Sequence, residues 1–121
     1  MPCDGRERAA LPRGRLQLAD TSVWARKKHP RIRGWFEAAV TKGDIAVCDM
    51  VVLELLHSAS SPAVYRQLED ELSAMPWIRM GAAEWERAII VYRLLSDRGR
   101  AAHRAVPHAD LLIAAAAEVS V

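Results

Sequence analysis

Three carboxylate side chains stand at positions in the sequence where a metal site would use them. Each borders or interrupts an apolar run, and no Lys or Arg lies within three residues of any of them: Asp20, Glu54 and Asp110. The runs are Leu16–Ala19, Val51–Leu56 and Ala109–Ala117. Ionised acids that converge away from water are best stabilised by a bound divalent cation. The pattern therefore indicates an Mg²⁺- or Mn²⁺-dependent site that hydrolyses phosphodiesters.

Each acid also has a purely structural interpretation. Asp20 could accept backbone hydrogen bonds at a strand-to-helix turn, where Asp is common. Glu54 shares a helical face with Met50 and His57, so it could point to solvent. Asp110 opens a helix whose dipole would stabilise it by only about 0.3–1 kcal/mol. Because burying an unpaired carboxylate costs several kcal/mol, Asp110 needs solvent, a basic partner or a metal.

Polar residues beside two of these acids could bind substrate. The hydroxyls of Thr21 and Ser22 could orient Asp20, contact a phosphate or cap a helix that begins at Val23. His108 lies two residues before the acid at position 110 and could contact substrate, or could simply be an exposed residue at a helix start. The histidines of the chain lack the paired spacing of a zinc motif, so we assign none of them to a metal.

The basic residues are clustered, although the net charge is only +2. They crowd residues 1–15, the segment 26–33 that follows Asp20, and the segment 98–104 that precedes Asp110. Such segments could hold phosphates beside a metal site, with Arg104 nearest to the third acid, or they could be solvated helix ends and loops.

Length and composition indicate one ordinary globular domain. The chain has 121 residues, of which 51% are hydrophobic and 26% charged. We expect a cytoplasmic protein, because the sequence has two cysteines, no signal peptide and no apolar run long enough for a transmembrane helix. It has no G-x-S-x-G, G-x-G-x-x-G or Walker motif, so acyl transfer, dinucleotide binding and NTP hydrolysis are unsupported.

Short apolar strands alternating with helices predict an α/β domain with a parallel sheet covered on both faces. We expect strands at 16–19, 45–48 and 77–80, with a last one beginning at 119–121. We expect helices at 23–29, 32–40, 49–57, 62–74, 82–98 and 107–118, with Asp49 and Ser61 as caps and Gly43 just past the second helix. Ligands gather at the carboxyl ends of such strands, so all three acids should lie near one edge of the sheet.

Two further expectations concern the core. Cys48 lies in a buried strand and should behave as a small hydrophobe. The four tryptophans at 24, 35, 77 and 85 fit core positions better than a platform for stacking bases, and positions 85, 88, 89, 92 and 95 form one apolar face of their helix. Residues 1–15 should form a disordered basic tail.

Three segments resemble the PIN domain, and in particular the VapC toxins of bacterial toxin–antitoxin pairs: Leu18–Trp24, Val52–Leu56 and Val106–Ala116. The resemblance runs from about Leu16 to Val121, so it implies a PIN-like domain over residues 16–121. It implies a three-layer α/β/α sandwich with a mainly parallel central sheet. By motif match, the metal ligands and catalytic residues would be Asp20, Glu54 and Asp110.

The activity that the resemblance implies is metal-dependent cleavage of structured RNA, commonly tRNA or rRNA. A VapB-like antitoxin would inhibit the protein by covering the acidic cleft, and the toxin would form a homodimer.

One departure from the family pattern matters. Members usually carry another acid just after the strand that follows the Ala-rich helix, and this sequence reaches Val121 inside that expected strand. We expect three carboxylates to bind one metal more weakly, which leaves a second hypothesis: a catalytically degenerate binding module that retains antitoxin or RNA affinity. A phospho-acceptor receiver domain fits less well, because Asp20 has no acidic neighbour.

Overall fold

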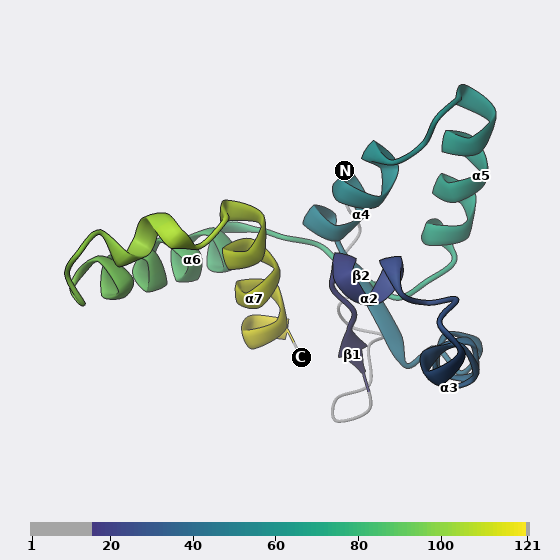
Figure 1. Ribbon diagram of the computed structural model, residues 1–121, viewed down its shortest axis with the longest axis horizontal. Helices are drawn as coiled ribbons and strands as arrows, with labels where there is room; N and C mark the ends of the chain where they lie inside the picture. The colour runs from purple at the N-terminus through teal and green to yellow at the C-terminus, as the bar shows by residue number, and fades with distance from the viewer. Residues whose placement is uncertain (1–15, 121) are drawn as a thin grey trace.

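A computed structural model describes residues 16–120 of the chain, so the predicted tail and Val121 lie outside the described residues. Within this range the protein is a mixed α/β domain with a three-stranded sheet in the order β1–β2–β3 (Figure 1). The strands span Gln17–Leu18, Ile45–Cys48 and Trp77–Ile78. The predicted fold class is confirmed.

Both strand pairs are parallel, as the alternation of strands and helices predicted. Gln17 pairs with Ile45 at the start of one ladder, and Cys48 pairs with Ile78 at the end of the other. The carboxyl ends of the strands therefore share one edge of the sheet. Asp20 follows β1 at this edge, and the helix that carries Glu54 begins directly after β2.

Figure 1 shows α6 and α7 together on one side of the sheet, with α3 and α5 on the other. The helices are α2 (Thr21–Ala25), α3 (Pro30–Thr41), α4 (Asp49–His57), α5 (Pro62–Ser73), α6 (Ala82–Ser96) and α7 (His108–Ser120), with the 3₁₀-helix η1 (Ala102–Ala105) before α7.

Local signals in the sequence explain several of these boundaries. Pro62 occupies the first turn of α5, and the Ser61 hydroxyl accepts a hydrogen bond from the backbone N–H of Val64 at 3.2 Å. Gly43 follows α3 with a φ of +77°, the left-handed conformation that glycine adopts without steric cost. Both of these predicted helix boundaries are confirmed.

The beginning of α2 differs from the prediction. We expected a helix from Val23 that Pro30 would end, but α2 spans only Thr21–Ala25 and its N-cap is Asp20. Pro30 instead opens α3, because its fixed φ and missing N–H suit the first position of a helix.

Asp49 does not cap α4 as predicted. It is the first residue of the helix, and its carboxylate bonds across to β3 and the residues after it. The indole Nε1 of Trp77 and the backbone N–H of Met80 each donate to it at 2.7 Å, and Arg79 donates at 3.2 Å. Asp49 therefore fixes the position of residues 77–80, which lead from the sheet into α6.

The strand expected at 119–121 is also wrong over the described residues, because α7 continues to Ser120. Alanine has the highest helix propensity, and four consecutive alanines precede Glu118. A helix that is already formed gains one hydrogen bond for each added residue, so it extends through Val119 despite the β-preference of valine.

The main core surrounds β2, whose four residues are all buried. Cys48 is fully buried, and desolvation raises the pKa of its thiol, so it is the small hydrophobe that was predicted. A second, smaller cluster joins α6 to α7 through Ala88, Leu111, Leu112 and Ala115. Ile113 of α7 belongs to the main core, so α7 connects the two clusters.

The predicted apolar face of α6 is only partly covered. Ala88 is buried, but Trp85 and Ile89 are 53% and 66% exposed. Trp35 of α3 is 54% exposed, so positions 35 and 85 were wrongly assigned to the core, whereas Trp24 is buried. Helical periodicity identifies an apolar face and does not show whether another element covers it. No helix in the described part of the chain is long and apolar enough to span a membrane.

Candidate functional site

Asp20 is held at the carboxyl end of β1 by hydrogen bonds from its own helix. Its Oδ1 accepts from the Ser22 hydroxyl at 2.7 Å and from the backbone N–H of Val23 at 3.1 Å. The Ser22 hydroxyl is the main cause that lowers the pKa of this carboxyl, and partial burial acts in the opposite direction. Asp20 is therefore ionised at neutral pH and is well placed to attract a cation.

A hydrogen bond from Thr21, the residue after Asp20, also holds Glu54 near the carboxyl end of β1. The Thr21 hydroxyl donates to Oε1 of Glu54, across 33 positions of sequence. Both side chains are half-buried, and both line a shallow cavity of about 450 Å³ together with Met50, Leu53 and His57. Glu54 thus faces α2 rather than open solvent, and Thr21, the residue after Asp20, fixes the Glu54 carboxylate.

Asp110 is not joined to the other two acids by any hydrogen bond. It is exposed in the first turn of α7 and has no side-chain partner among the described residues. α7 does pack against α4, the helix that carries Glu54. Within residues 16–120, no three His, Cys, Asp or Glu side chains are grouped closely enough to hold a metal ion. The three-acid ligand set remains a prediction.

The donor chemistry of the three acids nevertheless fits a hard cation. Asp20 accepts hydrogen bonds only at Oδ1 and Glu54 only at Oε1, and Asp110 accepts none from the described residues. Each carboxylate therefore keeps at least one oxygen without a donor. Oxygen ligands of this kind are the ones that Mg²⁺ and Mn²⁺ prefer.

The two hydroxyls beside Asp20 act on the acids in this arrangement. A hydroxyl has a single proton to donate, and Ser22 gives its proton to Asp20 while Thr21 gives its proton to Glu54. Neither side chain has a donor left for a phosphate. Of the roles considered from the sequence, positioning of a carboxylate is the one that these contacts support.

Arg104 and His108 lie on the side of the molecule formed by α6 and α7. Arg104 is exposed in η1 without an ion-pair partner in the described range. His108 is exposed at the start of α7, where its Nε2 lies 3.3 Å from the Tyr92 hydroxyl of α6. The rings of His108 and His103 both meet the Tyr92 ring edge-on, so His108 is oriented by α6. Their roles toward substrate stay predictions.

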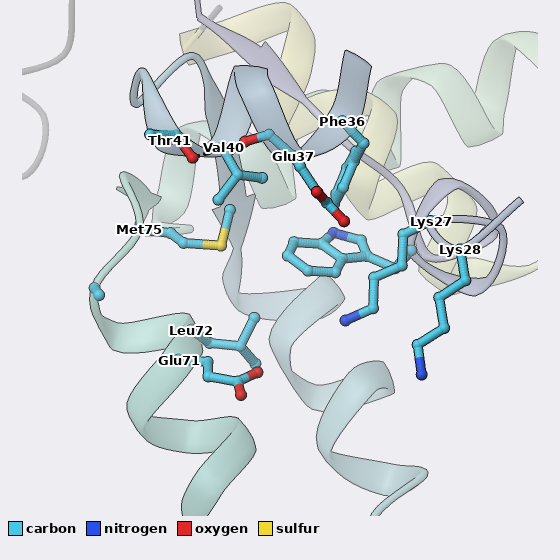
Figure 2. Close-up of a pocket in the computed structure, with 11 residues that line it drawn as sticks. Lys27, Lys28, Phe36, Glu37, Val40, Thr41, Glu71, Leu72 and Met75 are labelled. Atoms are coloured by element: carbon cyan, nitrogen blue, oxygen red, sulfur yellow. Dashed lines mark hydrogen bonds between the residues drawn. The ribbon is translucent and has the colours of Figure 1, made fainter. Parts of the chain in front are cut away.

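A larger cavity, of about 690 Å³, lies between α2, α3 and the end of α5 and was not expected from the sequence (Figure 2). Trp24, Lys27 and Lys28 line it, and we had assigned Trp24 to the core alone. The only signal in the sequence was a tryptophan one helical turn after Asp20, followed closely by two lysines. That spacing does not show which elements enclose a cavity.

Comparison with known proteins identifies the family of this α/β fold. The PIN domain matches residues 18–120 of the chain. Ribonuclease VapC18 of Mycobacterium tuberculosis is 43% identical over 101 residues, which cover 84% of this chain and 74% of that protein. Ribonuclease VapC51 of the same organism is 37% identical over 101 residues, covering 84% and 72%. Ribonuclease VapC21, also from this organism, is 33% identical over 102 residues with the same coverage. The chain therefore belongs to the PIN domain family, as a protein of the VapC type.

Proposed function

We propose that this protein is an endoribonuclease toxin that hydrolyses RNA phosphodiesters with the help of Mg²⁺ or Mn²⁺. One observation carries the proposal. At the carboxyl edge of the parallel sheet, Ser22 fixes Asp20 while Thr21 fixes Glu54, so two ionisable acids are held at one corner by adjacent residues. The ribonucleases to which the chain is similar support the same activity.

In this proposal Asp20, Glu54 and Asp110 hold the cation. When bound, the ion would activate a water molecule for in-line attack and neutralise charge on the phosphate. The Ser22 hydroxyl lowers the pKa of the Asp20 carboxyl and so favours its ionised form, and Thr21 keeps one oxygen of Glu54 turned toward α2. Asp110 would complete the set from α7, where free N–H groups in the first helical turn favour its negative charge.

The RNA would be held by basic side chains near the acids. Arg104 and His108 are exposed at the end of η1 and the start of α7, close in sequence to Asp110. We propose that they contact phosphates of the substrate, of which tRNA and rRNA are the expected classes. Arg26 and Lys28 follow Asp20 in the sequence, and the positive charge of Arg26 acts on the Asp20 carboxyl.

The proposed partner is a VapB-type antitoxin. A basic side chain of such an antitoxin, inserted between the three acids, would relieve the same repulsion that a cation relieves. We also propose a homodimer. Light scattering on the purified chain, alone and with a candidate antitoxin, measures both assemblies, and a monomer at all concentrations would exclude the dimer.

A cleavage assay with and without Mg²⁺ tests the activity. We expect Asp20→Asn and Asp110→Asn each to lower the rate by more than about 100-fold, because even loss of a residue behind a metal ligand costs 10- to 100-fold. Asp70→Asn is the matched control, since Asp70 is an exposed acid on α5. Unchanged cleavage by both variants would reject the site, provided that circular dichroism shows the fold intact.

The hypothesis of a degenerate binding module makes a different prediction. Calorimetric titration with Mn²⁺ separates the two, since the nuclease requires both metal binding and turnover. Metal binding by the wild-type protein with no cleavage of any RNA tested would favour the module. The observation behind this alternative is that Asp110 is exposed and has no side-chain partner among the described residues.

A further inference from the structure

The 690 Å³ cavity has the chemistry of a binding site rather than of a packing defect. It lies between α2, α3 and the end of α5. Figure 2 shows Val40, Leu72 and Met75 on one side of it, and Lys27 and Lys28 on the other. Glu71 lies beside Leu72, so the first wall is largely apolar with a carboxylate at its rim, and the opposite rim is cationic.

Trp24 contributes a buried hydrogen-bond donor that has no acceptor in the described part of the chain. Its side chain is only 9% exposed, and its buried Nε1 has no partner among the described residues. Phe36 meets the Trp24 ring edge-on, with ring centres 5.1 Å apart. Because an unsatisfied buried donor costs about 1–3 kcal/mol, a ligand that brings an acceptor to this nitrogen recovers that cost.

Charged side chains of both signs surround this aromatic pair. The Nζ of Lys27 lies 5.4 Å from the centre of the Trp24 ring, and Lys28 is exposed beside it. Neither lysine forms an ion pair with any described residue. Glu37 and Glu71 are exposed at the cavity, and Figure 2 shows Glu37 extending its carboxylate toward the middle.

This set of groups matches a nucleotide. A base is flat and stacks or packs on aromatic and apolar side chains, it carries acceptors for an indole N–H, and its own N–H groups can donate to a carboxylate. The phosphates attached to it would meet Lys27 and Lys28. An apolar peptide side chain would use the hydrophobic wall but leave the indole donor and the two lysines unmatched.

One residue of the cavity is close to Asp20 along the chain. Trp24 lies four residues after Asp20, which is about 6 Å along a helix at 1.5 Å per residue. We propose that the cavity is a base-binding subsite, which takes one unstacked nucleobase of the RNA substrate. This inference rests on the proposed ribonuclease activity.

Entry of the base requires small side-chain movements at the rim. The Nε1 atom of Trp24 is covered in the free protein, so a ligand reaches it only after a neighbouring side chain shifts. Lys28 and Glu37 are long and exposed, and such side chains change rotamer at low cost. The cavity volume exceeds what a single base needs, which leaves room for this rearrangement.

Binding of short single-stranded RNA tests the subsite. Fluorescence anisotropy with EDTA present measures affinity without cleavage, for a labelled RNA and for the same RNA made abasic. Trp24→Phe keeps an aromatic ring and removes the N–H, and Trp35→Phe is the matched control because Trp35 is 54% exposed and does not line the cavity. We expect Trp24→Phe to weaken the base-containing RNA by about three- to tenfold, the value of one hydrogen bond, and to leave the abasic RNA unchanged.

A second measurement does not depend on the stability of the variant. The wild-type protein has four tryptophans, so its ¹H–¹⁵N spectrum shows four indole signals, and the one absent from Trp24→Phe belongs to Trp24. Titration with guanosine or uridine monophosphate should shift that signal downfield. The signal of Trp35 should stay in place.

Three results would overturn the subsite. The first is that Trp24→Phe weakens binding of the intact and the abasic RNA equally. The second is that it weakens binding of neither RNA and that the Trp24 signal does not move. The third is that Trp24→Phe loses binding to a protein partner while its RNA binding is unchanged. The test also separates this inference from the proposed function. Cleavage by the wild-type protein, with no effect of Trp24→Phe on RNA binding and an unmoved Trp24 signal, rejects only the subsite, whereas a wild-type protein that neither binds nor cleaves RNA rejects both.

Discussion

The two halves of this molecule differ in how firmly they fix the three candidate acids. In the half built around the sheet, β2 is fully buried, and Asp20 and Glu54 are each held by a neighbouring hydroxyl. The half formed by α6 and α7 has a smaller apolar cluster and leaves Trp85 and Ile89 more than half exposed. The candidate acid in this half, Asp110, has no side-chain partner in the described range.

This difference shows which contacts must be made for the three acids to act together. The position of Asp110 depends on how α7 docks on the rest of the protein. Ile113 and Ala116 of α7 enter the main core, while Leu111 and Leu112 pack against α6. Asp49 fixes the connection between the halves, because it binds the chain just before α6 begins.

The largest effect is expected in the sheet half. Ile78 of β3 is fully buried in the main core, so Ile78→Ala should lower the free energy of unfolding by about 2–5 kcal/mol through lost burial and a new cavity. Ile90→Ala on α6, where the side chain is 40% exposed, should cost less than about 1 kcal/mol. Urea unfolding measures both. Equal losses would show that α6 is buried to the same extent as the sheet.

Asp49→Ala removes contacts that link the two halves and should lower the free energy of unfolding by about 2–3 kcal/mol. The substitution removes the acceptor of three donors from Trp77, Arg79 and Met80, and hydrogen bonds to a charged group contribute about 1.5–3 kcal/mol. Asp70→Ala, at an exposed acid of α5, is the control and should change stability by less than about 0.5 kcal/mol. Thermal unfolding gives the comparison. Similar midpoints for the two variants would mean that Asp49 does not hold this connection.

The sequence predicted the parts of this fold that rest on neighbouring residues. Ser61–Pro62 and Gly43 placed the start of α5 and the end of α3, and the run Ile45–Cys48 placed the central strand. These signals act within one turn of a helix or one strand, so they appear directly in the order of residues.

What depends on contacts between distant segments could not be predicted in this way. Asp49 has the residue type and position of a helix cap, but its partners lie 28 to 31 positions away. The bond from Thr21 to Glu54 spans 33 positions, so the sequence offered a helical face and gave no sign of its partner. The exposure of Trp35 and Trp85 likewise depends on which elements pack against α3 and α6.

Thr21→Val tests the connection between the two acids of the sheet half. Valine has nearly the same shape but cannot donate, so Oε1 of Glu54 would lose its partner. We expect a loss of about 1 kcal/mol in unfolding free energy and about tenfold weaker Mn²⁺ affinity by calorimetry. Thr21→Ser keeps the hydroxyl and should restore most of both. Retained Mn²⁺ affinity in Thr21→Val would show that Glu54 is positioned by other contacts, or is not a ligand.

The smallest expected effect concerns the charge of Asp20. The Ser22 hydroxyl lowers the pKa of this carboxyl, so Ser22→Ala should move it back up toward its ordinary value. Because the folded pKa is depressed, the ionised carboxylate stabilises the protein above the unfolded value of about 3.9, and that contribution is lost as the pH falls through the folded value. Carboxyl ¹³C titration of metal-free protein measures the shift directly, and Thr21→Val should leave it unchanged. A titration midpoint of Asp20 that is the same with and without the Ser22 hydroxyl would assign the lowered pKa to the backbone N–H groups of α2 instead.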